Sequence, residues 1–187
     1  MRVEILIIIL SCLLQFEGIP FAAETKYKVS EIPEELIAGS KIVVRSENIN
    51  FVLKSDKNAV MEVTYAITIM NENGERHGYF IEGYNKFIRI HNISGRIYDK
   101  EGKTVDRVKQ DKILDVSAIS GYSLFEDSRI KAYRPEYREF PFTVEYSYRI
   151  EYRGILSTPI WTPCRDYNAA VEDAKFTIQF PSDNPLS

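Results

Sequence analysis

Cysteine and histidine are scarce in this chain of 187 residues, and basic residues do not outnumber acidic ones. Its cysteines are Cys12 and Cys164, and its histidines are His77 and His91. Two histidines far apart in sequence, with so few cysteines, give no spacing typical of a metal site. The 24 Lys and Arg against 27 Asp and Glu leave a formal net charge of -3, so no basic domain points to nucleic acid. We therefore expect no metal, no cofactor and no nucleic-acid partner.

The one long apolar run stands at the N-terminus. Arg2 supplies a positive charge, Ile5 to Leu14 is apolar, and the small residue Ala23 offers a cleavage point. This order is typical of a secretory signal peptide, and the run is shorter than the roughly 20 apolar residues that cross a membrane. We expect a signal peptide over 1–23 and an exported protein, in the periplasm or at the cell surface.

Cys12 allows a second interpretation of this run. The sequence Ile9 to Cys12 loosely resembles a lipoprotein box, in which the cysteine is lipidated. Otherwise Cys12 is another apolar residue of the leader. A membrane partner is expected only if Cys12 is lipidated, and with the leader removed Cys164 has no cysteine to pair with.

Removal of the leader leaves about 160 residues, which is the size of one domain. The segment 24–40 is expected to be a lead-in with one short helix, in which Ser30 is the N-cap, Pro33 lies in the first turn and Gly39 follows the end. A loosely ordered connector is the alternative for this segment. Residues 41–187 are predicted to form a β-sandwich domain.

Period-two patterns dominate this domain. Val43 to Leu53 is rich in β-branched residues, and Val60 to Met70 alternates apolar and polar residues, which indicates a half-buried strand. Asn71 to Gly74 has the composition of a turn, and the following GYFIEGY is a candidate return strand. Phe142 to Tyr152 alternates without a break, and Ala174 to Pro181 is expected to be the last strand.

Between these strands the sequence predicts one hairpin and one irregular segment. Asp99 to Gly102 is the hairpin turn, and Gly95 before it suggests a bulge or kink. Gln110 to Arg138 has weak periodicity and is expected to be a long irregular loop. The predicted fold class is all-β, mainly antiparallel and β-sandwich-like, with a short N-terminal helix and this one long loop.

Cys164 is the residue to examine for catalysis, because CRDYNAA (Cys164 to Ala170) superficially resembles the nucleophile motif of transglutaminases. That family places its histidine after the cysteine, but both histidines of this chain precede Cys164. No helix is evident after it, and Pro163 replaces the usual small residue. We therefore expect no catalytic residue and no enzymatic activity, and interpret Cys164 as a small, partly buried apolar residue.

A possible contact surface lies near the end of the irregular segment. Tyr and Arg are enriched where proteins bind partners. Alternatively, the aromatic rings cover the end of the sheet and the cations face water. The six residues are Arg129, Lys131, Tyr133, Arg134, Tyr137 and Arg138.

The order of motifs from Glu35 to Pro181 resembles a family of domains of unknown function from secreted bacterial proteins. The matching features are I-Y-D-x-x-G-K at Ile97 to Lys103, the loop with Asp111 and Asp115, L-F-x-D-x-R-x-K at Leu124 to Lys131, E-Y-x-Y at Glu145 to Tyr148, and Trp161 after a proline. Members of this family usually precede a transglutaminase-like domain that carries the catalytic Cys, His and Asp. The resemblance implies a β-sandwich-like module without catalytic residues of its own, and a chain that is a fragment, a truncated product or a stand-alone copy.

Two functions follow as expectations. The first is a non-catalytic exported β-sandwich module that scaffolds, or binds substrate for, a transglutaminase-like or protease-like domain. The second is a stand-alone periplasmic or cell-surface module that binds peptide or glycan. The expected partner is a C-terminal transglutaminase-like domain, or another protein or glycan.

Overall fold

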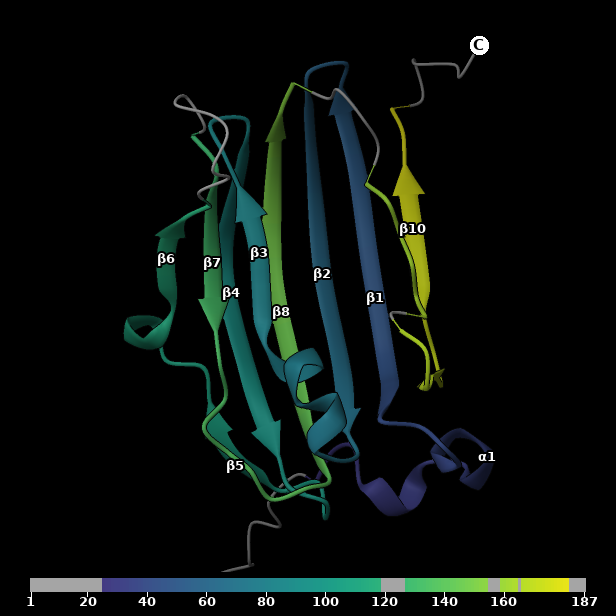
Figure 1. Ribbon diagram of the computed structural model, residues 1–187. Helices are drawn as coiled ribbons and strands as arrows, with labels where there is room; N and C mark the ends of the chain where they lie inside the picture. The colour runs from purple at the N-terminus through teal and green to yellow at the C-terminus, as the bar shows by residue number, and fades with distance from the viewer. Residues whose placement is uncertain (1–24, 119–126, 155–158, 165, 182–187) are drawn as a thin grey trace, which may run out of the picture.

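The computed structural model describes residues 25–118, 127–154, 159–164 and 166–181. These residues form a large seven-stranded sheet and a small three-stranded sheet packed face to face (Figure 1). The strands of the large sheet run in the order β10-β1-β2-β8-β4-β5, with β9 also pairing β1, and those of the small sheet in the order β3-β7-β6. The fold is all-β, mainly antiparallel and sandwich-like, as predicted.

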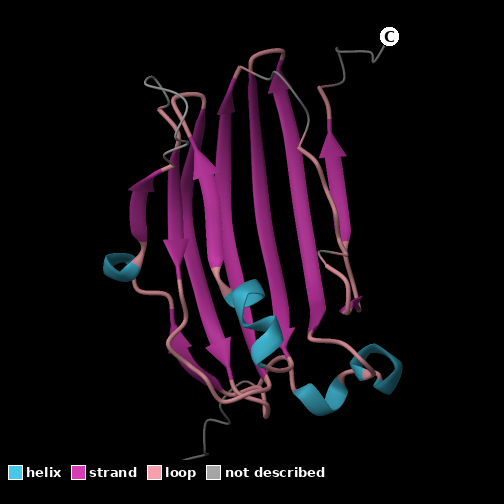
Figure 2. Cartoon of the chain, in the orientation of Figure 1, coloured by secondary structure: helices cyan, strands magenta, loops and turns pink. Residues whose placement is uncertain are grey.

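The strands are β1 (Ile42–Ser55), β2 (Asn58–Ile69), β3 (Phe80–Tyr84), β4 (Ile88–Tyr98), β5 (Thr104–Arg107), β6 (Leu114–Ser117), β7 (Arg129–Tyr133), β8 (Phe142–Arg153), β9 (Ala169–Val171) and β10 (Lys175–Gln179). Within the described residues, helical structure is confined to short pieces, drawn in cyan in Figure 2. They are η1 (Val29–Glu31), α1 (Glu34–Ile37), η2 (Glu72–Gly78) and η3 (Gln110–Lys112).

Strands β2 and β8 form the centre of the large sheet. They pair antiparallel over their full lengths, from Asn58↔Arg153 to Ile69↔Phe142. On one face they carry apolar and aromatic side chains, and on the other mostly polar ones, so the alternation read from the sequence is confirmed. We call the apolar face, which meets the small sheet, the inner face, and the polar face the outer face.

Two short strands pair with β1 in parallel on its other edge. β9 pairs from Ile42↔Ala169, and β10 pairs from Asn48↔Lys175 to Val52↔Gln179. The predicted last strand is therefore confirmed in position, and it joins the sheet in parallel. β9 was not predicted, since a strand of three residues shows no periodicity.

The segment 110–138 is not an irregular loop, so that prediction is wrong. It contains β6 and β7, which form two strands of the small sheet, and only 119–126 lies outside the described residues. All four residues of β6 are exposed. The sequence Leu-Asp-Val-Ser of β6 alternates over only four residues, so it does not stand out in this polar segment.

The predicted turn at Asn71 to Gly74 is also replaced by a helical piece, η2. The Asn71 side chain caps it by accepting a hydrogen bond from the Asn73 N–H at 3.1 Å. η2 carries the chain from the large sheet to the small one, so β3 pairs with β7 and not with β2. GYFIEGY thus contains a strand, as predicted, but the strand belongs to the second layer.

The lead-in packs against the outer face of the large sheet. Backbone bonds at 2.9 Å join Lys26 N to Gly102 O and Val29 N to Lys100 O, and Ile32 is buried. Its helix is only the four residues of α1, with Pro33 and not Ser30 at the N-cap. Gly39 has a φ of 74°, so the predicted glycine beyond the helix end is confirmed.

Aromatic rings join the two sheets. Phe80 and Tyr133 of the small sheet lie 5.6 and 6.5 Å from the ring of Tyr146 in the large sheet. The Tyr146 hydroxyl is fully buried and donates to Gly78 O at 2.8 Å. Burial raises the pKa of Tyr146, so this hydroxyl stays a donor at all ordinary pH values.

The hairpin turn at Asp99 to Gly102 is confirmed, with a φ of 79° at Gly102. The bulge predicted at Gly95 lies a few residues earlier, between His91 and Ser94, where Asn92 has a φ of 55°. Gly95 is required for a different reason. A Cβ there would lie 2.7 Å from the Glu145 backbone oxygen and 2.8 Å from Tyr146 Cδ1.

A charged group anchors the lead-in to the sheet at Glu145. This carboxylate accepts hydrogen bonds from Lys26, from Tyr27 at 2.9 Å and from Tyr98 at 2.7 Å. Burial alone would raise the pKa of Glu145, but the bonds from Lys26, Tyr98 and Tyr27 outweigh it and hold the pKa below 4.5. The lead-in is therefore fixed to β8 by a carboxylate that is ionised at neutral pH.

Replacement of Gly95 by alanine is expected to lower the free energy of unfolding by about 1–3 kcal/mol, because backbone and a packed ring must move to admit the methyl group. The matched control is Gly83→Ala, where a Cβ would meet nothing within 4 Å. That change should leave stability unaltered or raise it by up to about 1 kcal/mol. Urea unfolding followed by circular dichroism measures both, and equal effects would contradict the close approach at Gly95.

Replacement of Glu145 by glutamine is expected to lower the free energy of unfolding at pH 7 by about 1–3 kcal/mol, since donors in a partly buried site lose their charged acceptor. A carboxyl whose pKa is lowered on folding contributes stability that is fully present above pH 4.5 and is lost as pH falls through the folded pKa. The difference in the free energy of unfolding between the wild type and the variant should therefore become smaller below pH 4.5. Urea titrations at several pH values measure this difference. Glu62→Gln is the control, because Glu62 is exposed and its ion pair with Arg149 is long, at 3.6 Å.

Candidate functional site

A groove lies on the inner face of the large sheet beside the small sheet. In Figure 1 the small sheet stands in front of β4 and β8, and η2 stands in front of the lower part of β2. The groove has a volume of about 410 Å³, within the range of small-ligand sites. Its floor is made by Ile49, Met61, Val63, Tyr148, Ile150 and Tyr152. These residues are inner-face positions of β1, β2 and β8, so the alternation of the strands builds the floor directly.

The wall on the β1 side is held by Trp161. The Trp161 indole N–H donates to Glu47 Oε2 at 2.7 Å, and its ring stacks on Phe176 of β10 at 5.6 Å. Glu47 is 2% exposed. A buried carboxylate is stable only where donors reach it, so Glu47 and Trp161 fix one another. The wall continues through Pro159, Ile160 and Thr162.

The wall on the β8 side is made by β3. Tyr148 of β8 donates a hydrogen bond to Glu82 of β3, and Gly83 lines the groove next to it. At the groove's end, burial and then the nearby Glu82 carboxylate raise the pKa of Tyr152 to about 12. The groove thus has two carboxylates, on opposite walls, over an aromatic and aliphatic floor.

The chemistry of this groove suits binding better than catalysis. Among the described residues that line it, none is Cys, His, Lys or Arg. The apolar floor can bury side chains of a ligand, and the carboxylates can accept its hydrogen bonds. No nucleophile with an adjacent base is brought together here.

The predicted contact surface is split by the structure into separate places. Tyr133 is 3% exposed and belongs to the core, so its place in a contact surface is wrong. Tyr137 packs edge-on against Phe142 at 5.6 Å, as expected for a ring that covers the end of the sheet. The four cations remain on the surface, in two pairs.

Each pair of cations shares one carboxylate. Arg129 Nε lies 2.8 Å and Lys131 Nζ 3.4 Å from oxygens of Asp115. Hydrogen bonds from Tyr84 and Arg129 hold the pKa of Asp115 below its usual value.

Arg134 and Arg138 lie 3.0 and 3.3 Å from Glu75 Oε1. Hydrogen bonds from Tyr79 and Arg134 lower the pKa of that carboxyl. The four cations therefore do not form one continuous basic surface.

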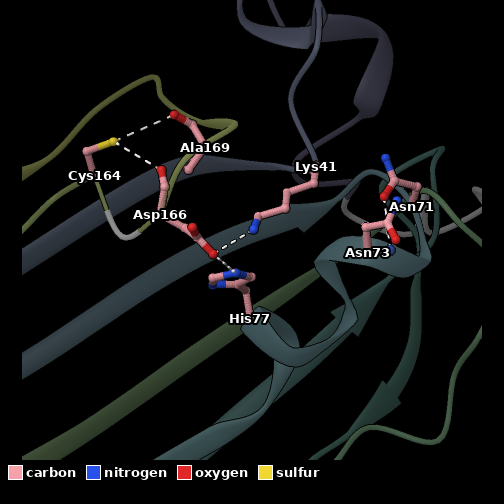
Figure 3. Close-up of polar contacts among 7 residues, drawn as sticks. All are labelled: Lys41, Asn71, Asn73, His77, Cys164, Asp166 and Ala169. Carbon is pink, nitrogen blue, oxygen red and sulfur yellow. Dashed lines mark hydrogen bonds and ion pairs between the residues drawn. The ribbon is translucent and has the colours of Figure 1, made fainter.

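Cys164 lies beside a small ionic cluster (Figure 3). Its thiol is exposed, contrary to the prediction of partial burial, and lies 3.6 and 3.7 Å from the backbone oxygens of Asp166 and Ala169. His77 Nε2 lies 3.2 Å and Lys41 Nζ 2.6 Å from Asp166 Oδ2. Figure 3 shows the Asp166 carboxylate turned toward His77 and Lys41, and the thiol turned toward the backbone.

This cluster is a structural tie between distant parts of the chain. A hydrogen bond from Lys41, with a smaller contribution from His77, holds the pKa of Asp166 low. The carboxylate joins the segment before β9 to η2 and to the start of β1. The imidazole is thus engaged by Asp166 at 3.2 Å.

Three further points concern metal ligands, membrane-spanning helices and the predicted signal peptide. Within the described ranges, no three His, Cys, Asp or Glu side chains are grouped so as to hold a metal ion. None of the helices in the described part of the chain is long and apolar enough to cross a membrane. The predicted signal peptide 1–23 and Cys12 lie outside the described residues, so export and lipidation stay predictions.

The groove itself was missed by sequence reasoning, although one signal pointed to it. Glu47 shares its strand face with Ile49 and Phe51, so strict alternation already places a carboxylate among buried residues. A charged residue at such a position indicates a partner or a site. Glu82 and Trp161 gave no comparable signal, because their neighbours show no clear period.

Comparisons with known proteins agree with this fold. The crystal structure of a "putative protease" from Parabacteroides distasonis has a TM-score of 0.63 to this chain at 15% sequence identity. The match covers 78% of this chain and 30% of that protein, so this chain spans less than a third of its length. The structure of yeast LTA4 hydrolase with bestatin, at a TM-score of 0.27 and 11% identity over 66% of this chain and 16% of that one, is too distant to indicate a shared fold. No curated protein matches the sequence.

The family model of a domain of unknown function that has solved structures, DUF3857, matches residues 55–187. The match covers most of the chain, from the end of β1 through β10. The predicted resemblance to a family of domains of unknown function is thereby confirmed, and this chain belongs to the DUF3857 family.

Proposed function

We propose that this chain is a non-catalytic binding module that holds an extended polypeptide segment in its groove. The observation that carries the proposal is the groove between Trp161 and β3, with its apolar floor and two carboxylates. Aromatic and aliphatic side chains with a few placed polar groups are typical of ligand sites. A groove open along a sheet suits an extended chain better than a compact ligand.

We further propose that the module serves a protease-like or transglutaminase-like domain, in the periplasm or at the cell surface. The Parabacteroides protein supports this context, because it is named a "putative protease" and this fold accounts for 30% of it. The remainder of that protein is large enough for a catalytic domain. A module that holds an extended substrate would raise its concentration at such a domain.

The non-catalytic part of the proposal is tested by alkylation of Cys164. The thiol points to backbone oxygens and His77 is engaged by Asp166, so the described residues place no base beside the sulfur. We expect iodoacetamide at pH 7 to modify Cys164 no faster than free glutathione, as measured by mass spectrometry of the digested protein. His77→Gln should leave the rate unchanged. A rate about tenfold above glutathione that falls in His77→Gln would contradict the proposal.

The binding part is tested through the fluorescence of Trp161, the single tryptophan of the chain, which lies in the groove wall. We expect its emission to change on titration with reduced, alkylated ribonuclease A, an unfolded polypeptide without tryptophan. Cellohexaose serves as the glycan probe. A response to the polypeptide alone supports the proposal, whereas a response to the glycan alone, or to neither, contradicts it.

Two matched variants locate this binding. Ile160 lines the groove and is 96% exposed, so Ile160→Asp should not unfold the chain. It should weaken polypeptide binding by about fivefold through the loss of one apolar contact. Val116→Asp makes the same change at an exposed position outside the groove and should have no effect. Equal losses in both variants would place the binding elsewhere.

A further inference from the structure

One edge of β3 borders the groove, and no strand in the described part of the chain pairs with it. β3 pairs with β7 from Phe80↔Tyr133 to Tyr84↔Arg129, and it ends the small sheet on the groove side. Among the described residues, no ladder joins its other edge. An edge strand presents backbone N–H and C=O groups that can pair with another chain.

The groove gives such a chain room and a surface on which to lie. Glu82 and Gly83 of β3 line the groove, and a Cβ at Gly83 would meet nothing within 4 Å. The five residues of β3 extend over about 17 Å, the length of a short peptide strand. Alternate side chains of an added strand would point to the apolar floor, which is how strand addition gains specificity.

The charges of the groove select one kind of side chain for that position. Glu82 is the groove carboxylate within reach of an added strand, because Glu47 is 2% exposed and held by Trp161. The described lining holds no Lys, Arg or His. On the other edge of β3, Lys131 of β7 already stands opposite Glu82. A carboxylate can accept several hydrogen bonds, so a basic side chain at the same register of a second strand also reaches it.

The other edge of the small sheet lacks these features. β6 carries the exposed side chains Leu114 and Val116, but it contributes no residue to the groove. A strand added there would meet neither the groove floor nor Glu82. The edge of β3 is therefore the one at which backbone pairing and side-chain recognition coincide.

We propose that the groove takes its ligand by β-strand addition. An extended peptide of a partner protein pairs with the groove-side edge of β3, and directs a lysine or arginine side chain toward Glu82. This inference rests on the proposed peptide-binding function and adds the mode of binding and the required side chain.

The test uses the full chain and a defined probe, the peptide acetyl-Ser-Val-Lys-Val-Thr-amide. Binding is read from Trp161 fluorescence and from hydrogen exchange of the β3 amides. Five further peptides each carry one N-methyl group, at successive amides. Strand addition predicts that methylation at alternate amides weakens binding at least about tenfold, through loss of a hydrogen bond and a steric clash, while the intervening positions are tolerated.

The outcomes separate this proposal from the one on which it rests. Period-two sensitivity, together with slower exchange of β3 amides, supports strand addition. Uniform tolerance of N-methylation, or no binding of the probe, overturns strand addition. Groove binding itself still stands in that case if unfolded ribonuclease A changes the fluorescence of Trp161, and it fails if that polypeptide gives no response.

The basic side chain is tested with matched changes in peptide and protein. The lysine peptide should bind about threefold more tightly than its norleucine counterpart, as for a partly exposed ion pair. Glu82→Gln keeps an acceptor for the Tyr148 hydroxyl but removes the negative charge. It should therefore abolish the preference for the lysine peptide over the norleucine peptide. Glu62→Gln, on the outer face, should retain it. A preference that survives in Glu82→Gln contradicts the assigned position of the basic side chain.

Discussion

The double pairing of β8 is the constraint on which the rest of the structure depends. Its residues pair with β2 on one edge and with β4 on the other over nearly the whole strand. Because both ladders fix the same register, every second side chain must face the small sheet. Tyr146 and Tyr148 are thereby held on the inner face, where one supports the core and the other reaches Glu82.

The groove follows from a difference in size between the two layers. The large sheet carries β1, β2, β9 and β10 beyond the area that three short strands can cover. The inner face of β1 and β2 stays apolar there, and its side chains are largely buried, with Val63 at 3% and Ile67 at 0% exposure. Trp161 and Phe176 cover one side of this face beside the groove. The groove is thus a by-product of the difference in size between the layers.

The elements that the sequence predicts are strands with one buried and one exposed face, and turns with a glycine at a position of positive φ. β2, β8 and the turn at Asp99 to Gly102 followed from alternation and from glycine chemistry. β6 and β7 did not, because such short strands do not stand out in a polar segment. Tyr133 was misassigned for a related reason. A short strand beside arginines gives no local sign of which residue the distant sheet will cover.

The candidate site was still less predictable, because its walls come from segments far apart in the chain. Glu47 and Trp161 are separated by 114 positions, and Glu82 and Tyr148 by 66. Of these residues, only Glu47 breaks the pattern of its strand, because it is a charged residue on the apolar face of β1. Its charge on a buried face marks a position where tertiary structure overrides local pattern.

β9 and β10 lie end to end along β1. The pairing of these two short strands with β1 is less stable than the pairing among the long strands. Each short parallel ladder is held by few bonds, whereas β1 keeps a full antiparallel partner in β2. Detachment of the terminal segment from β1 is therefore a sub-global opening that spares the sandwich. Such an opening would carry Trp161 away and remove one wall of the groove, so a ligand bound there, as proposed, would stabilise the pairing of β9 and β10 with β1.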